Sequence, residues 1–527
     1  MSDVVSVETL ENLLEHCLQH FREMKEPFSD AALFHLAKIS CQVESAKALV
    51  HQNSTHRKLI QFHIHNSLSL VRSKLSEFPQ DFGFKSIAQI FDKNENQPPF
   101  SLPELVELGK SIASHGSVPE LALDENHLMI KDTFRKFADT TVAPLAEKIH
   151  RQDLLIPEEI ISQLKELGCF GLNIPESFGG FQSETDPDYL GMILVTEELS
   201  RGSLGAAGSL ITRPEILARA LLKGGTEAQK KLWLPKIASG EKMAAIAVTE
   251  PDYGSDVAGL KVTATPKTVG SLKGWILNGT KTWCTFAGRA DVLAVLARSS
   301  PDMSLKHKGL SLFLVEKPRE LGHSFHLNQN ECGTIEARAI PTIGYRGMHS
   351  FEVKFENWFV PDSHLVGGEA GLGKGFYFQM EGFAAGRLQT AARANGLMHA
   401  ALEKAISYAN ERKIFGKSIA EQPASSIKLA QMSSALLASR ALTYHASKNL
   451  EKPNGILLAA MSKLYASQTA EWLTREAQQL HGGMGYAEEF AVSRYFVDAR
   501  VLSIFEGAEE VLAVKVIAPA LIGKKDL

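Results

Sequence analysis

Apolar residues recur every three or four positions over most of this chain, which is the spacing of amphipathic helices. Near the start, this spacing predicts three helices, over residues 7–24, 30–50 and 57–78. A polar, proline-bearing segment over residues 91–102 then predicts a loop or linker. No catalytic pattern precedes it. Residues 1–120 are therefore interpreted as a helical N-terminal extension that serves packing or oligomerisation.

The helical spacing continues through residues 121–243, which we predict to form a helical domain. Gly168 and Gly240 each stand just after one predicted helix, where helix C-termini favour glycine. The predicted helices cover residues 127–150, 157–167, 189–200 and 228–239.

The period changes to two residues within 244–366. Phe351, Val353 and Phe355 alternate with charged residues, as in a half-buried strand. The pair Asn278-Gly279 lies between two strand-like runs and predicts a hairpin. Residues 292–296 and 310–315 supply further strands, so this part is predicted to be a small β-domain.

After a glycine-rich segment, residues 367–375, the helical spacing returns. That segment lacks the strand–GxGxxG–helix frame of a dinucleotide loop, so a connection between domains is favoured. The helices that follow are long enough to form a bundle, and they cover residues 376–412, 425–450, 456–480, 490–502 and 508–521. The predicted fold is mainly α with a central β-domain, and its last domain spans residues 367–527.

The amino-acid composition restricts the kinds of protein that this chain can be. With 527 residues, 44% hydrophobic and 22% charged, the chain has the composition of a soluble globular protein of several domains. A net charge of −4 does not favour a nucleic-acid surface. The five scattered cysteines and the lack of an apolar leader or span favour a cytoplasmic protein without disulfides. No His, Asp or Glu spacing predicts a metal site.

A small set of motifs remains to be explained. Each has a structural explanation by itself: Trp283 could fill a core, Gly482 and Gly483 could end a helix, and Glu506 could be solvated. Their order and joint spacing do not follow from packing. Trp283 and Thr285 are two residues apart, which predicts that they share one face of a strand. The segments are AVTEPDYGSD (247–256), NGTKTWCT (278–285), NERKIFGKSIAEQP (410–423), QLHGGMGY (479–486) and SIFEGAEEVL (503–512).

With these motifs in this order, the chain from about residue 123 onward resembles the acyl-CoA dehydrogenase family. The resemblance implies an α-domain, a β-domain and a C-terminal four-helix bundle. It also implies an FAD cofactor and α,β-dehydrogenation of an acyl-CoA, with electrons passed to electron-transfer flavoprotein. A homodimer or homotetramer is expected, without nucleic acid or membrane as a partner.

The resemblance places the catalytic base at Glu506, which would take the α-proton of the thioester. A free glutamate titrates near pH 4.3, so the site must assist this step. Gly386 stands where some members carry the base instead, which leaves Glu506 without a rival. Ala508 replaces the threonine usual at its position and removes one hydroxyl contact to FAD.

The resemblance also implies the binding residues. Arg412, Phe415 and Gln479 are expected to serve the FAD of a neighbouring subunit. The full expected cofactor set is Val248, Thr249, Ser255, Trp283, Thr285, Arg412, Phe415, Gln422, Gln479, Gly482, Gly483, Ala508 and Glu510. The expected substrate set is Ser255, Phe383, Arg387, Arg213 and Gly507.

The N-terminal extension and the segments SLITRPEI (209–216) and IGYRGMHSFEV (343–353) resemble one branch of the family. That branch oxidises (2S)-methylsuccinyl-CoA to mesaconyl-CoA in the ethylmalonyl-CoA pathway. A dicarboxylic thioester needs a cation, for which Arg213 is the candidate, although a surface arginine at a helix start is an equal alternative. Ala207 stands where glutaryl-CoA dehydrogenases carry an arginine, which disfavours that branch.

Other functions stay open from the sequence. One is a dehydrogenase of short or branched monocarboxylic acyl-CoA, and another is an acyl-CoA oxidase that passes electrons to O₂. A DNA-binding flavoprotein of the alkylation-response group is disfavoured by the net negative charge.

Overall fold

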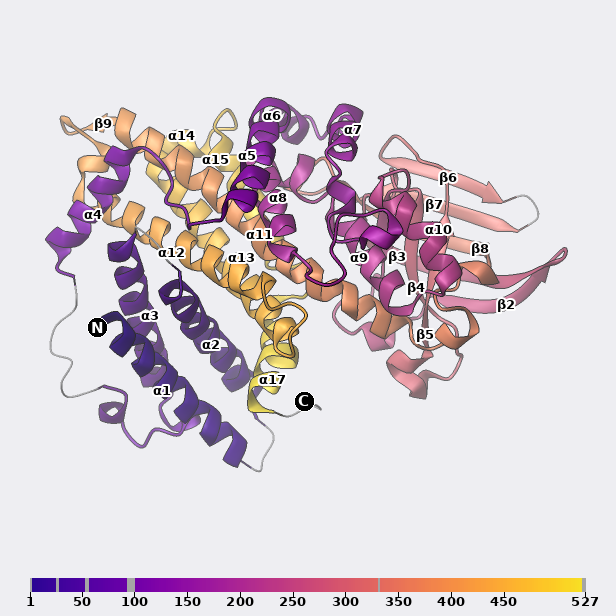
Figure 1. The fold of residues 1–527 in the computed structure, drawn as a ribbon, viewed down its shortest axis with the longest axis horizontal. Coiled ribbons are helices and arrows are strands. Elements are labelled where there is room, and N and C mark those ends of the chain that lie inside the picture. The colour runs from indigo at the N-terminus through magenta and orange to yellow at the C-terminus, as the bar shows by residue number, and fades with distance from the viewer. Residues whose placement is uncertain (1, 25–27, 53–55, 92–99, 330–331, 524–527) are drawn as a thin grey trace. The chain divides into compact units, whose positions relative to one another are not determined.

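The computed structural model describes residues 2–24, 28–52, 56–91, 100–329 and 332–523 (Figure 1). The chain forms two compact units, one of Met1–Thr133 with Thr390–Leu527 and the other of Phe134–Gln389. Helices α5 (Glu125–Phe137) and α11 (Gly375–Glu411) each carry the chain from one unit into the other. No helix among the described residues combines the length and the apolar character that a bilayer-spanning segment requires.

The first unit is helical. The three helices predicted for the N-terminal extension are confirmed; the first begins five residues before its predicted start, and the other ends agree to within one residue. Helix α4 was not predicted; a capping box of Ser101 and Glu104 starts it, and Gly116, with φ of 69°, ends it. Most of the predicted loop 91–102 lies outside the described residues. The helices of this unit are α1 (Ser2–Glu23), α2 (Asp30–Val50), α3 (Arg57–Glu77), α4 (Leu102–His115), α12 (Pro423–Ser447), α13 (Gly455–His481), α14 (Gly483–Tyr486), α15 (Ala491–Leu502), α16 (Glu509–Val511) and α17 (Ala518–Ile522).

The N-terminal helices share a core with the C-terminal ones. Helices α2 and α3 pack against α12, and α2 also contacts α13 (Figure 1). His63 of α3 is buried, and its Nε2 lies 3.1 Å from the Ser45 hydroxyl and 3.2 Å from the Ser67 hydroxyl. Burial lowers the pKa of His63 to about 4. The extension is thus an integral part of this unit.

The helices of the second unit follow the prediction except at one place. Gly168 and Gly240 have φ of 71° and 69°, so both take the left-handed conformation expected after a helix. Helix α9 was not predicted, because residues 212–221 are buried on every side and so show no apolar–polar period. The helices here are α6 (Ala143–Arg151), α7 (Glu158–Glu166), α8 (Tyr189–Gly202), α9 (Thr212–Gly224) and α10 (Glu227–Ala238).

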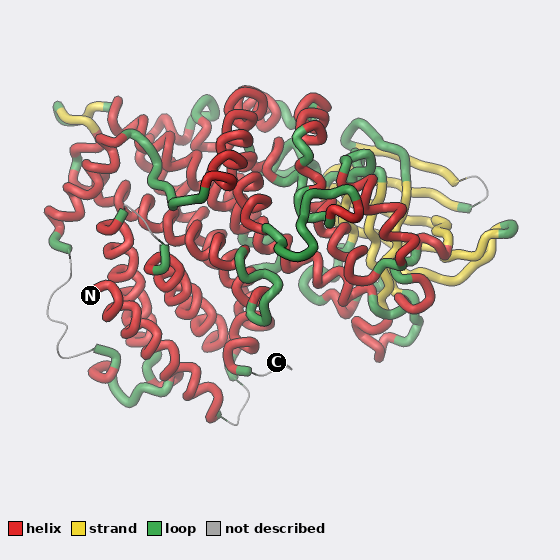
Figure 2. The backbone as a smooth tube through the Cα atoms, in the orientation of Figure 1, coloured by secondary structure: helices red, strands yellow, loops and turns green. Residues whose placement is uncertain are grey.

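The second unit also contains an eight-stranded sheet (Figure 2). Its order is β1-β4-β2-β3-β8-β7-β6, with β5 paired to β4. Leu217 of α9 and Trp233 of α10 pack with Leu312 in one buried cluster, which joins helices to sheet. The alternating pattern predicted at Phe351–Phe355 is confirmed. The strands are β1 (Ala244–Ala247), β2 (Thr263–Val269), β3 (Leu272–Thr285), β4 (Val292–Arg298), β5 (Leu310–Glu316), β6 (Ser324–Gln329), β7 (Gly333–Ala339) and β8 (Ser350–Pro361).

The predicted hairpin at Asn278-Gly279 is wrong. Strand β3 runs through this pair, and its register against β8 shifts between Leu277 and Gly279, which marks a β-bulge. Gly279 has φ of 126°, and the Asn278 side-chain oxygen accepts a hydrogen bond from the backbone N–H of Asn357 at 2.8 Å. The actual turn lies at Gly270, with φ of 59°. This bulge, like a tight hairpin turn, places a glycine at positive φ, so the Asn-Gly pair cannot distinguish the two.

Candidate functional site

A buried ion pair fixes the segment that follows β1. The ammonium of Lys281 donates to the carbonyl of Val248 and to the Glu250 carboxylate, each at 2.8 Å. The same carboxylate accepts hydrogen bonds from the backbone N–H groups of Lys261 and Val262. Burial lowers the pKa of Lys281, and Glu250 opposes that shift. The first residues of the 247–256 motif are therefore held firmly against β3.

This anchor brings Thr249 close to Trp283 in the structure. The Thr249 carbonyl accepts a hydrogen bond from the backbone N–H of Thr282 at 2.8 Å. Trp283, the next residue, is 54% exposed, which is unusual for an indole on a strand. An exposed aromatic face beside backbone and hydroxyl groups is suited to cover a planar ligand. Ser255, further along the motif, is exposed.

The prediction that Trp283 and Thr285 share one face rests on the period of a regular strand, and β3 is not regular at this point. Trp283 has φ of 55°, and the β3–β8 register shifts between Lys281 and Cys284. The period-two alternation is interrupted there, so Thr285 is 8% exposed and Trp283 is largely open. The Thr285 hydroxyl lies 2.9 Å from the Ser350 hydroxyl of β8.

Arg213 lies in the first turn of α9 and is only 5% exposed, so the surface-arginine alternative is wrong. Its guanidinium donates to the Tyr345 hydroxyl at 3.0 Å and to the Ser209 carbonyl at 3.4 Å. Among the described residues it makes no ion pair with a carboxylate. The hydroxyl of Thr212, next to it, is buried without a hydrogen-bond partner among those residues.

Tyr345 is a site residue that sequence reasoning missed. Its backbone has φ of 58°, a left-handed conformation rarely taken by aromatic residues. The segment packs tightly on a π-helical turn, Leu204–Gly208, since a Cβ at Gly205 would lie 2.2 Å from the Arg346 carbonyl oxygen. The one available signal was an aromatic residue between glycines at 344 and 347, which does not reveal its partner.

Glu215 was missed as well. It is buried, and the Asn173 side-chain amide donates to its carboxylate at 2.6 Å. Burial raises the pKa of Glu215 to about 7, against the opposing effects of Arg219 and Asn173. The interior near the start of α9 therefore holds several polar groups that a purely apolar core would not contain.

Phe383 and Arg387 lie four residues apart on α11, within the second unit, and hence on one face of the helix. Both side chains are half-buried, whereas Gly386 between them is buried. This arrangement is compatible with contacts to an elongated substrate.

Glu506 lies in the first unit, in the connection after α15. Its backbone has φ of 54°, and its Oε2 is shielded from solvent without a hydrogen-bond partner among the described residues. Gly507, with φ of 102°, follows it, and its carbonyl accepts a hydrogen bond from Lys463 at 2.6 Å. Left-handed backbone at a non-glycine residue stores strain of the kind found at functional sites. Glu506 thus combines a constrained backbone with a carboxylate oxygen that is shielded from solvent and has no hydrogen-bond partner among the described residues. Ala508, after Gly507, is half-buried, and Glu510 is exposed.

The remaining predicted cofactor residues of the first unit lie in exposed segments. Arg412 follows the end of α11, and Phe415 is 95% exposed with φ of 51° between two short strands, β9 (Lys413–Ile414) and β10 (Lys417–Ser418). The Gln422 amide donates to the Ile414 carbonyl at 3.2 Å. Gln479, Gly482 and Gly483 are exposed around the end of α13, and Gly482 has φ of 59°.

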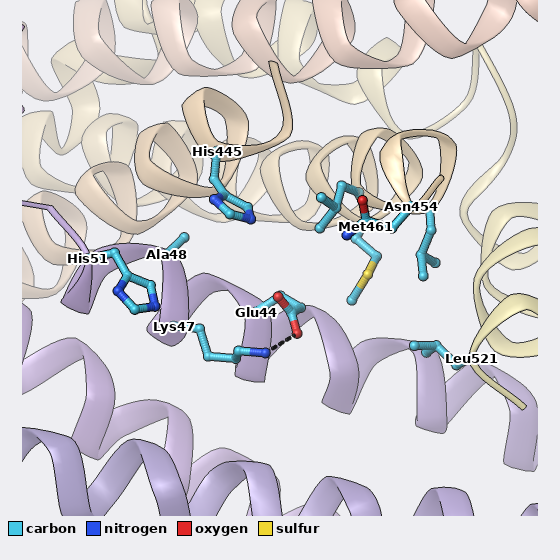
Figure 3. Close-up of a pocket in the computed structure, with 10 residues that line it drawn as sticks. Glu44, Lys47, Ala48, His51, His445, Asn454, Met461 and Leu521 are labelled. Carbon is cyan, nitrogen blue, oxygen red and sulfur yellow. Dashed lines mark hydrogen bonds and ion pairs between the residues drawn. The ribbon is translucent and has the colours of Figure 1, made fainter. Parts of the chain in front are cut away.

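A cavity of about 340 Å³ lies elsewhere in the first unit, between α2 and the C-terminal helices (Figure 3). Glu44 and Lys47 form an ion pair of 3.0 Å on its wall. His51 and His445 also line it, and burial lowers the pKa of His445. None of the predicted site residues lines this cavity.

Three family models match successive parts of the chain. The acyl-CoA dehydrogenase N-terminal domain matches residues 124–241, the middle domain residues 245–358 and the C-terminal domain residues 373–522.

Individual relatives agree with these models. The chain is 43% identical to (2S)-methylsuccinyl-CoA dehydrogenase of Cereibacter sphaeroides over 80% of this chain and 74% of the relative. The structure of butyryl-CoA dehydrogenase from Megasphaera elsdenii matches at 30% identity and a TM-score of 0.68, over 76% of this chain and all of that one. A glutaryl-CoA dehydrogenase from Mycobacterium smegmatis in complex with FADH2 matches at 26% identity and a TM-score of 0.65, over 77% of this chain and 96% of that one.

Proposed function

This chain belongs to the acyl-CoA dehydrogenase family, and from that premise we propose that it oxidises (2S)-methylsuccinyl-CoA to mesaconyl-CoA. The family, its fold and its FAD cofactor, all predicted from the sequence, are confirmed. The enzyme is an FAD-dependent oxidoreductase acting on a CH–CH bond of an acyl-CoA. The substrate, the site residues and the partners below are proposals.

The residues present fit a bound flavin nucleotide. Trp283 and Phe415 expose aromatic surface of the kind that a planar ring or a neighbouring subunit would cover. Thr249 and Arg412 offer a hydroxyl and a forked cation, which suit ring edges and a pyrophosphate. Thr249 and Trp283 would hold the FAD of their own chain, and Arg412 and Phe415 would hold that of a neighbouring subunit; FAD supplies a hydride acceptor when bound.

Glu506 is the proposed base. Its shielded Oε2, unpartnered among the described residues, is available to take the α-proton of the thioester. As the α-proton goes to Glu506, the electrons of that bond form the double bond, and the β-hydrogen leaves with its electron pair. Both hydrogens are then accounted for, one as a proton on Glu506 and one as a hydride.

The observation that carries the substrate assignment is the buried guanidinium of Arg213. A cation that is 5% exposed and has no carboxylate partner among the described residues is costly to keep. The free carboxylate of methylsuccinyl-CoA would offset that cost. The Tyr345 hydroxyl, which accepts a hydrogen bond from Arg213 at 3.0 Å, would hold the guanidinium in position for this carboxylate.

A monocarboxylic substrate is the second candidate, supported by the similarity to butyryl-CoA dehydrogenase. It would leave the Arg213 guanidinium without a counter-charge. We also propose electron-transfer flavoprotein as the electron acceptor, by analogy with the family. A homodimer or homotetramer would cover Phe415 and Arg412, which are exposed on the single chain.

The proposal is tested by anaerobic reduction of the bound flavin with a panel of CoA esters. The panel contains methylsuccinyl-, succinyl-, glutaryl-, isobutyryl- and butyryl-CoA. We expect kcat/KM for methylsuccinyl-CoA to exceed that for each other ester by at least about tenfold, a difference of about 1.4 kcal/mol in transition-state binding. A preference for butyryl- or isobutyryl-CoA would contradict the assignment and favour the second candidate.

A further inference from the structure

Three potential metal ligands converge in the second unit, from segments far apart in the sequence. Asp153 follows α6, His323 precedes β6 and His349 precedes β8. One ligand atom from each lies within 4.8 Å of the others. The sequence predicted no metal site because it could judge only spacing along the chain, and these residues are separated by 170 and 26 positions.

A neutral His349 leaves one of its two ring nitrogens facing an acceptor that it cannot donate to. Its Nδ1 lies 3.2 Å from the Gly347 carbonyl oxygen, and its Nε2 lies 3.1 Å from Asp153 Oδ1. Both neighbours can only accept, whereas a neutral imidazole has a single N–H to donate. If Nδ1–H donates to Gly347, the lone pair of Nε2 faces the carboxylate. That pair of acceptors needs a cation between them, either a second proton or a metal ion.

The geometry suits a metal ion of the zinc class. An imidazole whose Nδ1–H is oriented by a carbonyl and whose Nε2 is the ligand is the usual arrangement of a zinc-bound histidine. With metal–ligand bonds of about 2.0–2.1 Å in a tetrahedron, ligand atoms lie about 3.3 Å apart, close to the observed Nε2–Oδ1 distance. His323 is exposed, and its ring centroid is 4.4 Å from that of His349, so a small side-chain rotation would bring its nitrogen into range.

The backbone at the cluster is constrained. Asp153 and His349 have φ of 52° and 41°, both left-handed without being glycine. The carbonyl of His323 accepts a hydrogen bond from the backbone N–H of Ala339 at 2.7 Å, which fixes that segment too. Such strain persists where the surrounding structure holds side chains in required positions.

One nearby charge opposes cation binding. The guanidinium of Arg346 lies 3.8 Å from Asp153 Oδ1. It donates to the carbonyls of Thr342 and His150, each at 3.0 Å, so its position is set by backbone groups and not by the carboxylate alone. We therefore expect moderate affinity and not the tight binding of a four-ligand zinc site.

We propose that Asp153, His323 and His349 form a binding site for a divalent transition-metal ion. Zn²⁺ is the ion that fits best, and a water molecule would be its fourth ligand. The ion would tie the segment after α6 to the segment before β8. The His349 carbonyl accepts a hydrogen bond from Phe286 at 2.8 Å, next to Thr285 of the expected flavin-binding set, so the ion would stabilise that wall. Its role is structural, since the site does not depend on the identity of the acyl-CoA.

The test is titration of Zn²⁺ into the untagged, FAD-loaded full chain after chelator treatment and dialysis, followed by calorimetry. We expect one site per chain with a moderate Kd of about 1 μM, and a higher Tm with Zn²⁺ present. His323→Ala should weaken binding by at least about tenfold, because it removes a ligand from an exposed position that the fold does not need.

His326→Ala is the matched control, since this exposed histidine lies three residues further along, on β6, outside the cluster. It should bind Zn²⁺ like the wild type. Asp153→Asn, which keeps the shape of the side chain but loses its charge, should also weaken binding. Absence of saturable binding, or equal affinities of His323→Ala and His326→Ala, would overturn the proposal and leave a proton as the cation between His349 and Asp153.

Discussion

Replacing Arg213 with methionine removes a buried charge and keeps a side chain of similar length. The guanidinium is 5% exposed, so a substrate carboxylate bound there would lose its partner in a site with little water to replace it. Breaking a buried pair from one side typically costs about 3–5 kcal/mol. At about 1.4 kcal/mol per tenfold, kcat/KM for methylsuccinyl-CoA should fall by roughly two to three orders of magnitude.

The assay is steady-state turnover of Arg213→Met with methylsuccinyl-CoA and with butyryl-CoA, supported by the FAD content of each preparation. Butyryl-CoA carries no free carboxylate, so its kcat/KM should stay equal or rise. Tyr345→Phe removes a hydrogen bond that the charged Arg213 guanidinium donates, and it should cost about 1.5–3 kcal/mol, or roughly ten- to a hundredfold, again for methylsuccinyl-CoA alone. Arg338→Met is the control for an exposed arginine on β7 and should change neither substrate.

An equal loss of kcat/KM for both substrates would show that Arg213 stabilises the fold and does not bind the substrate carboxylate. An unchanged kcat/KM for methylsuccinyl-CoA would refute the pairing itself.

Two further predictions concern stability and assembly. The pKa of Glu215 is raised from 4.5 to about 7. Between these pH values the folded chain keeps a proton that the unfolded chain has lost, so the free energy of unfolding falls as pH rises. The total loss, reached above pH 7, is about 3 kcal/mol. Glu215→Gln lacks this titration, so its Tm advantage over the wild type should grow from pH 4.5 to 7; parallel Tm profiles would contradict the burial argument. Arg412→Ala should both lose FAD and shift the oligomer towards monomer, whereas Lys413→Ala, beside it on β9, should do neither. Analytical sedimentation followed by flavin absorbance measures both effects. A native protein that is a fully FAD-loaded monomer would refute the shared site.

The local pattern of apolar and polar residues was sufficient to predict those helices and strands that have one buried face and one solvent-exposed face. The helices at residues 30–50 and 57–78 and the alternation of Phe351, Val353 and Phe355 were predictable because one face is buried and the other solvated. Helix α9 was not, since its first ten residues are all buried and carry no periodic signal. The Asn278-Gly279 pair did not predict the structure because the bulge formed here places Gly279 at positive φ, as a hairpin turn would.

The residues of the candidate site also fall into those that local sequence could identify and those that depend on long-range packing. Motif order identified Thr249, Trp283 and Glu506 as residues of interest, because each motif is contiguous in sequence. The exposure of Trp283 depends on a register shift that only the paired strands reveal. The burial of Arg213, and its bond to a tyrosine 132 positions away, follow from long-range packing that no local spacing encodes.

The central claim is that Glu506 takes the α-proton of methylsuccinyl-CoA, and rapid-mixing reduction of the bound flavin under anaerobic conditions tests it most directly. Glu506→Gln keeps the size of the side chain and should retain FAD, but it removes the proton acceptor. The control is Glu509→Gln, whose carboxylate already accepts a hydrogen bond from Gln468 at 2.7 Å and which should reduce the flavin at close to the wild-type rate. The account predicts that flavin reduction in Glu506→Gln is slower by at least about two orders of magnitude. Retention of more than about a tenth of the wild-type rate would contradict it and place the base on another residue.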